Sequence, residues 1–167
     1  GLEGVVAAET KLCDLDGTNG RLAYGGYDIA ELARQATFEE VCYLLWRGEL
    51  PSRGQYDQLV ISRVAARDIP RELVAAFKTM PKDTDPNRPL QAAIAILGMH
   101  DPDANDNSPA ANYRKAIRLT SQIATAVCAH HRGRSGQDPV PPAPDLSHAA
   151  NFLYMLTGER AAPAAVK

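Results

Sequence analysis

Apolar residues recur at helical spacing along most of this chain, and capping residues divide them into separate helices. The segment from Thr37 to Glu40 has the pattern of a capping box, and Gly48 is placed to end the helix that it starts. Ser52 and Pro70 are placed to begin the next two helices. The apolar stripes of these helices consist of Tyr56, Leu59, Val60 and Val64 in the first, and Leu73, Val74 and Phe77 in the second.

The start of the chain has a different pattern, that of a β-hairpin. Residues 10–15 can form one strand and residues 21–24 the return strand, with turn signals at Asp16-Gly17 and Asn19-Gly20 between them. Everything after this hairpin has helical spacing. The pattern therefore predicts an all-α fold with one short N-terminal β-hairpin and no other sheet.

Two later helices are apolar on more than one side, which is typical of helices buried on two sides. Between Pro89 and Met99, a first stripe (Leu90, Ala93, Ile94, Leu97) and a second (Ala92, Ala95, Ile96, Met99) share one helix. The longest predicted helix, from Pro109 to Arg132, has no charged residue between Leu119 and Ala129. We predict that these helices form a subunit interface, although both stripes could instead be buried inside one larger domain. The predicted interface residues are Ala92, Ala95, Ile96, Met99, Ile123 and Val127.

The end of the chain begins with a loop rich in Pro and Gly, from residue 133 to residue 145. Asp145 is then placed to cap a last helix that runs through Leu156, and Gly158 is placed at its C-terminal end.

Composition and charge exclude several classes of protein. The formal net charge is -2, so nothing favours binding to nucleic acid, and no apolar stretch is long enough to span a bilayer. The three cysteines (Cys13, Cys42 and Cys128) are odd in number and far apart, so they predict neither a disulfide framework nor a paired metal site. We therefore expect a protein of the cytoplasm without metal, nucleic-acid or membrane partners.

The histidines offer few candidates for chemistry. His148 lies in the first turn of the last helix, where it could contact a carboxylate, or it could pack near the helix start and bond to a loop, which we favour. Cys128 and His131 share a helix face, but adjacent His130 and His131 point in different directions on a helix. Since a metal site needs three or four converging ligands, we expect no metal there.

Charged residues around the two apolar helices give two further patterns. Asp101, Asp103 and Asn105 imitate the start of a calcium loop, but Asp106 and Asn112 stand where that loop needs Gly and Glu, so we expect a surface loop. Basic residues cluster on and after the longest helix, where they could meet a CoA phosphate but more commonly form a solvated face. These are Arg114, Lys115, Arg118, Arg132 and Arg134.

Four segments, in the same order along the chain, resemble the citrate synthase family, including its 2-methylcitrate synthase relatives. They are Gly1 to Thr10, Gly20 to Ile29, Phe38 to Pro51 and Asp145 to Gly158, the last being the most specific. The resemblance covers essentially the whole chain. It implies the large helical domain of that family, a homodimer, and residues 1–167 as the N-terminal portion of that domain.

The resemblance also implies an activity. Enzymes of this family join acetyl-CoA to oxaloacetate, giving citrate and CoA, by general acid–base catalysis with no cofactor, since acetyl-CoA is a substrate. In the family, the catalytic aspartate and histidines and the carboxylate-binding arginines all lie beyond the point that matches Lys167. We therefore assign no catalytic residue, leave substrate-binding residues unknown, and expect this chain alone to be inactive. The alternatives are 2-methylcitrate synthase, which uses propionyl-CoA, and a non-catalytic helical interaction module.

Overall fold

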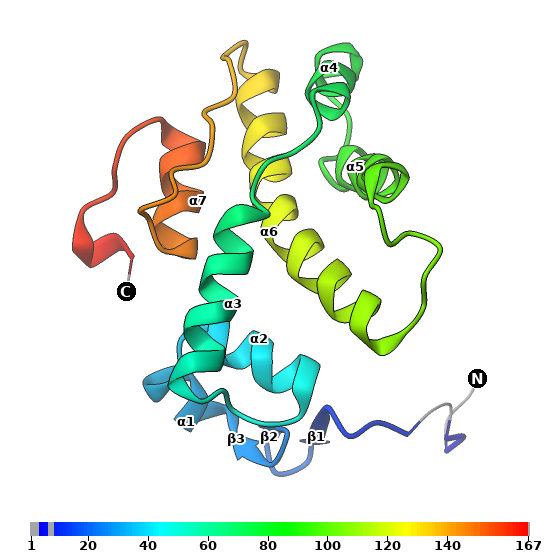
Figure 1. The fold of residues 1–167 in the computed structure, drawn as a ribbon, viewed down its shortest axis with the longest axis vertical. Helices are drawn as coiled ribbons and strands as arrows, with labels where there is room; N and C mark the ends of the chain where they lie inside the picture. Colours follow the sequence, from blue (N-terminus) through cyan, green and yellow to red (C-terminus); the bar gives the residue numbers. More distant parts are fainter. Residues whose placement is uncertain (1–3, 7–8, 167) are drawn as a thin grey trace. The chain divides into compact units, whose positions relative to one another are not determined.

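The structure is a computed structural model that describes residues 4–6 and 9–166. The chain divides into two units, residues 1–60 and residues 61–167, each with its own internal packing. The predicted fold class is confirmed, because helices dominate both units and the described residues contain one small sheet near the N-terminus (Figure 1).

The sheet of the first unit is the predicted hairpin with one strand added. Strand β1 (Cys13–Asp16) pairs antiparallel with β2 (Arg21–Tyr24), and β2 pairs with the two-residue β3 (Tyr27–Asp28). The Asp16 carboxylate fixes the turn, because it accepts hydrogen bonds from the backbone N–H groups of Thr18 and Asn19. The first strand begins at Cys13, three residues later than predicted.

The helices of the first unit follow their capping residues. Helix α1 (Ile29–Gln35) is capped by Asp28, whose side chain accepts a hydrogen bond from Ala30 N. Helix α2 (Phe38–Arg47) starts with the predicted capping box and ends at Gly48, which has a φ of 81°. Helix α3 (Arg53–Ala65) follows Ser52, as predicted, and continues into the second unit.

The second unit is built around one long helix. Helix α6 (Pro109–Arg134) lies between helix α7 (His148–Thr157) and the pair formed by α4 (Arg71–Thr79) and α5 (Asn87–His100), as Figure 1 shows. A short 3₁₀ turn, Pro163–Ala165, follows α7. The prediction that Asp145 caps the last helix is wrong. The cap is Ser147, whose hydroxyl accepts a hydrogen bond from Ala150 N, while Asp145 pairs with Arg160 at 2.7 Å.

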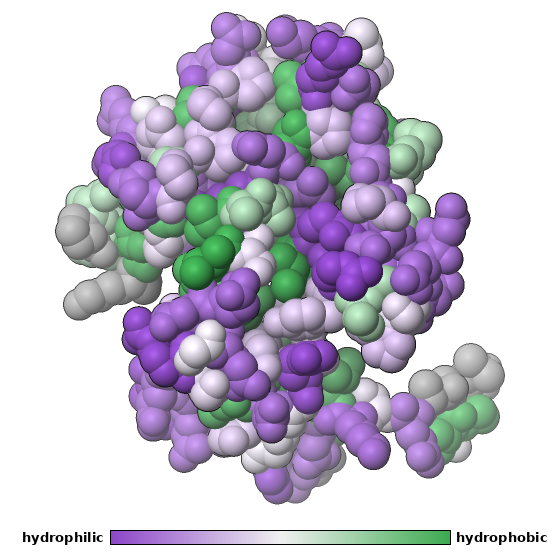
Figure 2. Space-filling model, viewed as in Figure 1, coloured by the Kyte–Doolittle hydropathy of each residue, from purple (hydrophilic) through white to green (hydrophobic). Residues whose placement is uncertain are grey.

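Two clusters of buried side chains hold this unit together. The first joins α4, α5 and α6 and consists of Leu73, Phe77, Ala93, Leu97, Ala126 and Ala129. The second joins α6 to α7 through Ala124, Cys128 and Met155. The small residues of α6 allow its neighbours to approach closely on both sides. Hydrophilic residues dominate the surface in the view of Figure 2, and no helix among the described residues is long and apolar enough to cross a membrane.

Candidate functional site

Helix α5 presents one face to its own unit and leaves the opposite face open. Pro89, Ala93 and Leu97 are buried against the core. On the other side lie Ile94, Ala95, Gly98 and Met99, which we call the outer α5 face; Met99 is 76% exposed and Ile94 40%. Exposed large apolar residues in such a group mark a site where something else packs.

The six predicted interface residues do not share one degree of burial. Ala95 and Met99 are exposed, whereas the other four are half-buried: Ala92, Ile96, Ile123 and Val127. Ile96 packs against the cluster between α4, α5 and α6, so much of its surface is used inside the subunit. Ile94 was placed in one stripe with Ala93 and Leu97, but these two are buried while Ile94 lies on the outer α5 face. The helix is thus rotated about its axis relative to the predicted stripes.

A shallow groove of about 300 Å³ runs beside this face, between α5 and α6. Its lining includes Ile94 and Gly98 from α5, and Leu119 and Gln122 from α6. Leu119 is 37% exposed and extends the apolar surface from one helix to the other. Sequence reasoning did not select Ile94 or Leu119. The uncharged run that begins at Leu119 could have indicated Leu119 as an interface residue.

The loop that imitates a calcium site is held by arginines. Arg118 donates from Nη2 to carboxylate oxygens of both Asp101 and Asp103 at 2.6 Å, and Arg114 donates to Asp103 at 2.6 Å. These hydrogen bonds hold the pKa of both carboxyl groups below the usual range. Both arginines are therefore engaged with carboxylates of their own unit, and Lys115 donates to the backbone oxygen of Asp106. The network ties the α5–α6 loop to α6.

His148 belongs to a second polar network, within residues 61–167. Arg63, which is 3% exposed, donates to His148 Nδ1 at 2.8 Å, so the ring is neutral and carries its proton on Nε2. Burial, with Arg63 and Arg67 nearby, lowers the pKa of His148 to about 4. His148 lies near the helix start, as favoured, and Arg63 of α3 is one of its partners.

The same network fixes the loop before α7. Arg67, 6% exposed, donates to the backbone oxygens of Ala143 at 2.7 Å and Leu146 at 2.8 Å. Asn151 accepts a hydrogen bond from Ala143 N, and Thr125 donates to the backbone oxygen of Arg67. Each buried polar group here satisfies a backbone group, which is a structural role.

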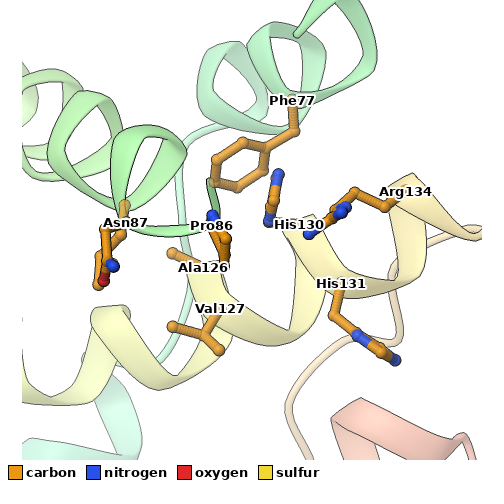
Figure 3. A pocket seen from close by; sticks show the side chains of 9 residues that line it. Phe77, Pro86, Asn87, Ala126, Val127, His130, His131 and Arg134 are labelled. Atoms are coloured by element: carbon orange, nitrogen blue, oxygen red, sulfur yellow. The ribbon is translucent and has the colours of Figure 1, made fainter. Parts of the chain in front are cut away.

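The cysteine and histidine candidates on α6 do not converge. Cys128 is buried, its Sγ lies 3.4 Å from the Phe152 oxygen, and burial raises the pKa of its thiol to about 12. His130 is buried and His131 is exposed, and the two project differently from α6 (Figure 3). Among the described residues, no three His, Cys, Asp or Glu side chains are grouped so that they could hold a metal ion.

The last two basic candidates, Arg132 and Arg134, have separate environments at the end of α6. Arg132 donates to the backbone oxygens of Asp138 and Leu156, and so joins the loop to the end of α7. Arg134 is exposed and lines a cavity beside His130.

Comparison with known proteins defines the class to which this helical fold belongs. The sequence model described as "Citrate synthase, C-terminal domain" matches residues 1–167. The chain is 40% identical to the citrate synthase of Deinococcus radiodurans over 98% of its own length, and 39% identical to citrate synthase 2 of Bacillus subtilis over 100%. The solved citrate synthase of Pyrobaculum aerophilum covers 99% of the chain with a TM-score of 0.92 and 34% identity.

The chain therefore belongs to the citrate synthase family. It spans less than half of these relatives, namely 43% of the Deinococcus radiodurans enzyme and 45% of the Bacillus subtilis one. The same holds for the Pyrobaculum aerophilum structure, of which it covers 43%.

Proposed function

We propose that this chain supplies scaffold and dimer helices to a citrate synthase, which condenses acetyl-CoA with oxaloacetate to give citrate and CoA. The observation that carries the proposal is the 40% identity to the Deinococcus radiodurans citrate synthase across 98% of the chain. Because the chain spans 43% of that enzyme, the catalytic residues are proposed to belong to the part that it does not match.

The structure of the second unit supports a scaffold role. Its buried arginines bond to backbone oxygens and to a histidine, and the arginines of α6 at the α5–α6 loop bond to carboxylates. None of these groups is presented together with a general acid and base at one open site. We therefore propose that the chain alone does not catalyse the condensation.

The outer α5 face and the groove beside it are proposed as part of the interface of a homodimer. They combine exposed Met99, Ile94 and Leu119 on neighbouring helices of one unit. Apolar surface of this kind packs well against a second copy of itself, because a two-fold interface brings the same patch from both subunits together. Ala95 and Met99 are retained from the predicted set, and Ile94 and Leu119 are added.

A chimera tests the activity. The segment of the Deinococcus radiodurans enzyme that matches this chain is replaced by residues 1–167, and oxaloacetate-dependent release of CoA thiol is measured. We expect activity from the chimera and none from the 167-residue chain, because general acid–base groups typically contribute ~10²–10⁴-fold in rate. A folded, dimeric but inactive chimera contradicts the catalytic proposal and favours a non-catalytic helical module. Activity of the chain alone contradicts the placement of the catalytic groups.

A second candidate is 2-methylcitrate synthase. The chain is 36% identical to the 2-methylcitrate synthase of Mycobacterium tuberculosis and 33% identical to the citrate/2-methylcitrate synthase of Bacillus subtilis. The relatives named citrate synthase have the higher identities, so we propose acetyl-CoA and not propionyl-CoA as the substrate of the whole enzyme.

A further inference from the structure

A second cavity lies in the same unit, where α4, the start of α5 and the last turns of α6 meet (Figure 3). Its volume is about 370 Å³, which is within the range of small-molecule sites. The walls are mostly apolar and are formed by Phe77, Pro86, Leu90, Ala126 and Val127. The polar part of the lining contains two histidines, one arginine and Asn87, and no carboxylate.

His130 is the buried polar group of this cavity. It is 9% exposed, and its ring packs on Phe77 with ring centroids 5.3 Å apart and planes tilted by 60°. Within the described part of the chain, His130 makes no hydrogen bond. Burial, with Arg134 and His131 nearby, lowers its pKa, so the ring is neutral and offers one N–H donor and one acceptor. Because its ring nitrogens are not among the fully buried side-chain atoms that lack a partner, they reach the cavity and can bond to a ligand there.

Arg134 places a permanent positive charge at the same cavity. It is exposed in the last turn of α6, and its guanidinium lies close to His130 in Figure 3, whereas His131 projects away. No carboxylate of a described residue pairs with Arg134, in contrast to Arg114 and Arg118 of the same helix. The cavity thus joins apolar walls to one fixed cation and one neutral hydrogen-bond donor.

We propose that this cavity binds a small organic carboxylate with an apolar body, such as a single ring or a short branched chain. The carboxylate pairs with the Arg134 guanidinium through a charge-assisted hydrogen bond and accepts from the His130 N–H. The apolar body packs between Phe77 and the aliphatic side chains of α5 and α6. A polyanion such as an organic phosphate is a poorer match, since one fixed cation faces the cavity.

The probe is 3-phenylpropionate, with the uncharged 3-phenylpropanol as its matched control, and binding to the 167-residue chain is measured by NMR titration. A ligand of this size contributes about -0.3 kcal/mol per non-hydrogen atom, which corresponds to a dissociation constant of about a few millimolar. We expect the carboxylate to bind at least about tenfold more tightly than the alcohol, because a hydrogen bond to a charged group is about twice as strong as a neutral one. Equal affinity for the two compounds would overturn the assignment of a carboxylate.

Two variants locate the binding. Arg134→Gln should weaken binding of 3-phenylpropionate about tenfold, whereas Arg71→Gln, which removes the same charge from a 94% exposed position outside the cavity, should not. Asn87→Trp should abolish binding by filling the cavity, and Asn87 is exposed, so the substitution leaves the core intact. Circular dichroism checks folding. A probe that does not bind, or that binds the Asn87→Trp variant as well as the unsubstituted chain, refutes the site.

Discussion

The outer α5 face yields the prediction that bears most directly on assembly. If a second copy covers this face, an aspartate in place of Ala95 carries a charge into an apolar contact. Ala95 is exposed and lies between Ile94 and Met99 on this side of α5, so the substitution removes little from the subunit's own core. Ile96 is a poorer position for the test, because it packs against the core of its own unit and a charge there would unfold the chain.

The expected loss follows from what the face still exposes. Burying a whole Met side chain contributes about 1.5–3 kcal/mol, so the 76% of Met99 that remains exposed corresponds to about 1–2 kcal/mol per copy. An unpaired charge in a buried contact costs about 3–5 kcal/mol. Because a two-fold contact contains the substitution twice, the dissociation constant of the dimer should rise by at least about a hundredfold.

Sedimentation or light scattering on the 167-residue chain measures this directly, since the monomer has a mass of 18.0 kDa. The unsubstituted chain should self-associate, and Ala95→Asp should return it to monomer. Ala75→Asp makes the same change at an exposed position of α4, outside this face, and should leave association unchanged. If the Ala95→Asp variant stays folded by circular dichroism and associates as before, the interface is refuted. If it unfolds, the face is part of an internal core.

Three further predictions concern the polar networks. Arg67→Met should lower the free energy of unfolding by about 3–5 kcal/mol in urea titrations, because two hydrogen bonds from a buried charge are lost; a change under about 1 kcal/mol would contradict this. Since the pKa of His148 is about 4 when folded and 6.5 otherwise, the unfolded chain binds the proton more tightly, and stability falls as pH drops from about 6.5 to about 4. The loss is about 1–2 kcal/mol after solvent screening, and urea titrations of His148→Gln should not show it. Arg118→Met should increase hydrogen exchange in the α5–α6 loop, residues 101–108, while α7 stays protected.

Features that depend on neighbouring residues in the sequence were predictable from it. The capping box from Thr37 to Glu40 and the end of α2 at Gly48 depend on contacts within four residues, and both are confirmed. The cap of α7 was assigned to the wrong residue, Asp145. Asp145 and Ser147 both precede α7, and the pairing of Asp145 with Arg160, 15 residues later, accompanies the use of Ser147. Helix α1 was not singled out, because its seven residues are too few for a periodic stripe.

The rotation of α5 about its axis could not be predicted from the sequence, for a different reason. A helix that is apolar on two sides fits more than one rotation about its axis, and packing against α6 and α4 selects one of them. That selection turned Ile94 outward and Ile96 toward the core. The polar candidates were limited in the same way, because the partners of Asp101 and Asp103 lie 11 to 17 residues away along the chain, on a different element.

The buried polar residues of the second unit separate scaffold from possible chemistry. Arg67, Ser121 and Thr125 each bond to a backbone oxygen, Asn151 accepts from a backbone N–H, and Arg63 donates to His148, so their hydrogen bonds serve the fold. A group that serves a ligand must keep a donor or acceptor available until the ligand arrives. Among the buried polar side chains of the described residues, His130 meets this condition, because it lines a cavity and makes no hydrogen bond. The same criterion places the arginine–loop contacts in the scaffold and supports the proposal that the His130 cavity binds a ligand.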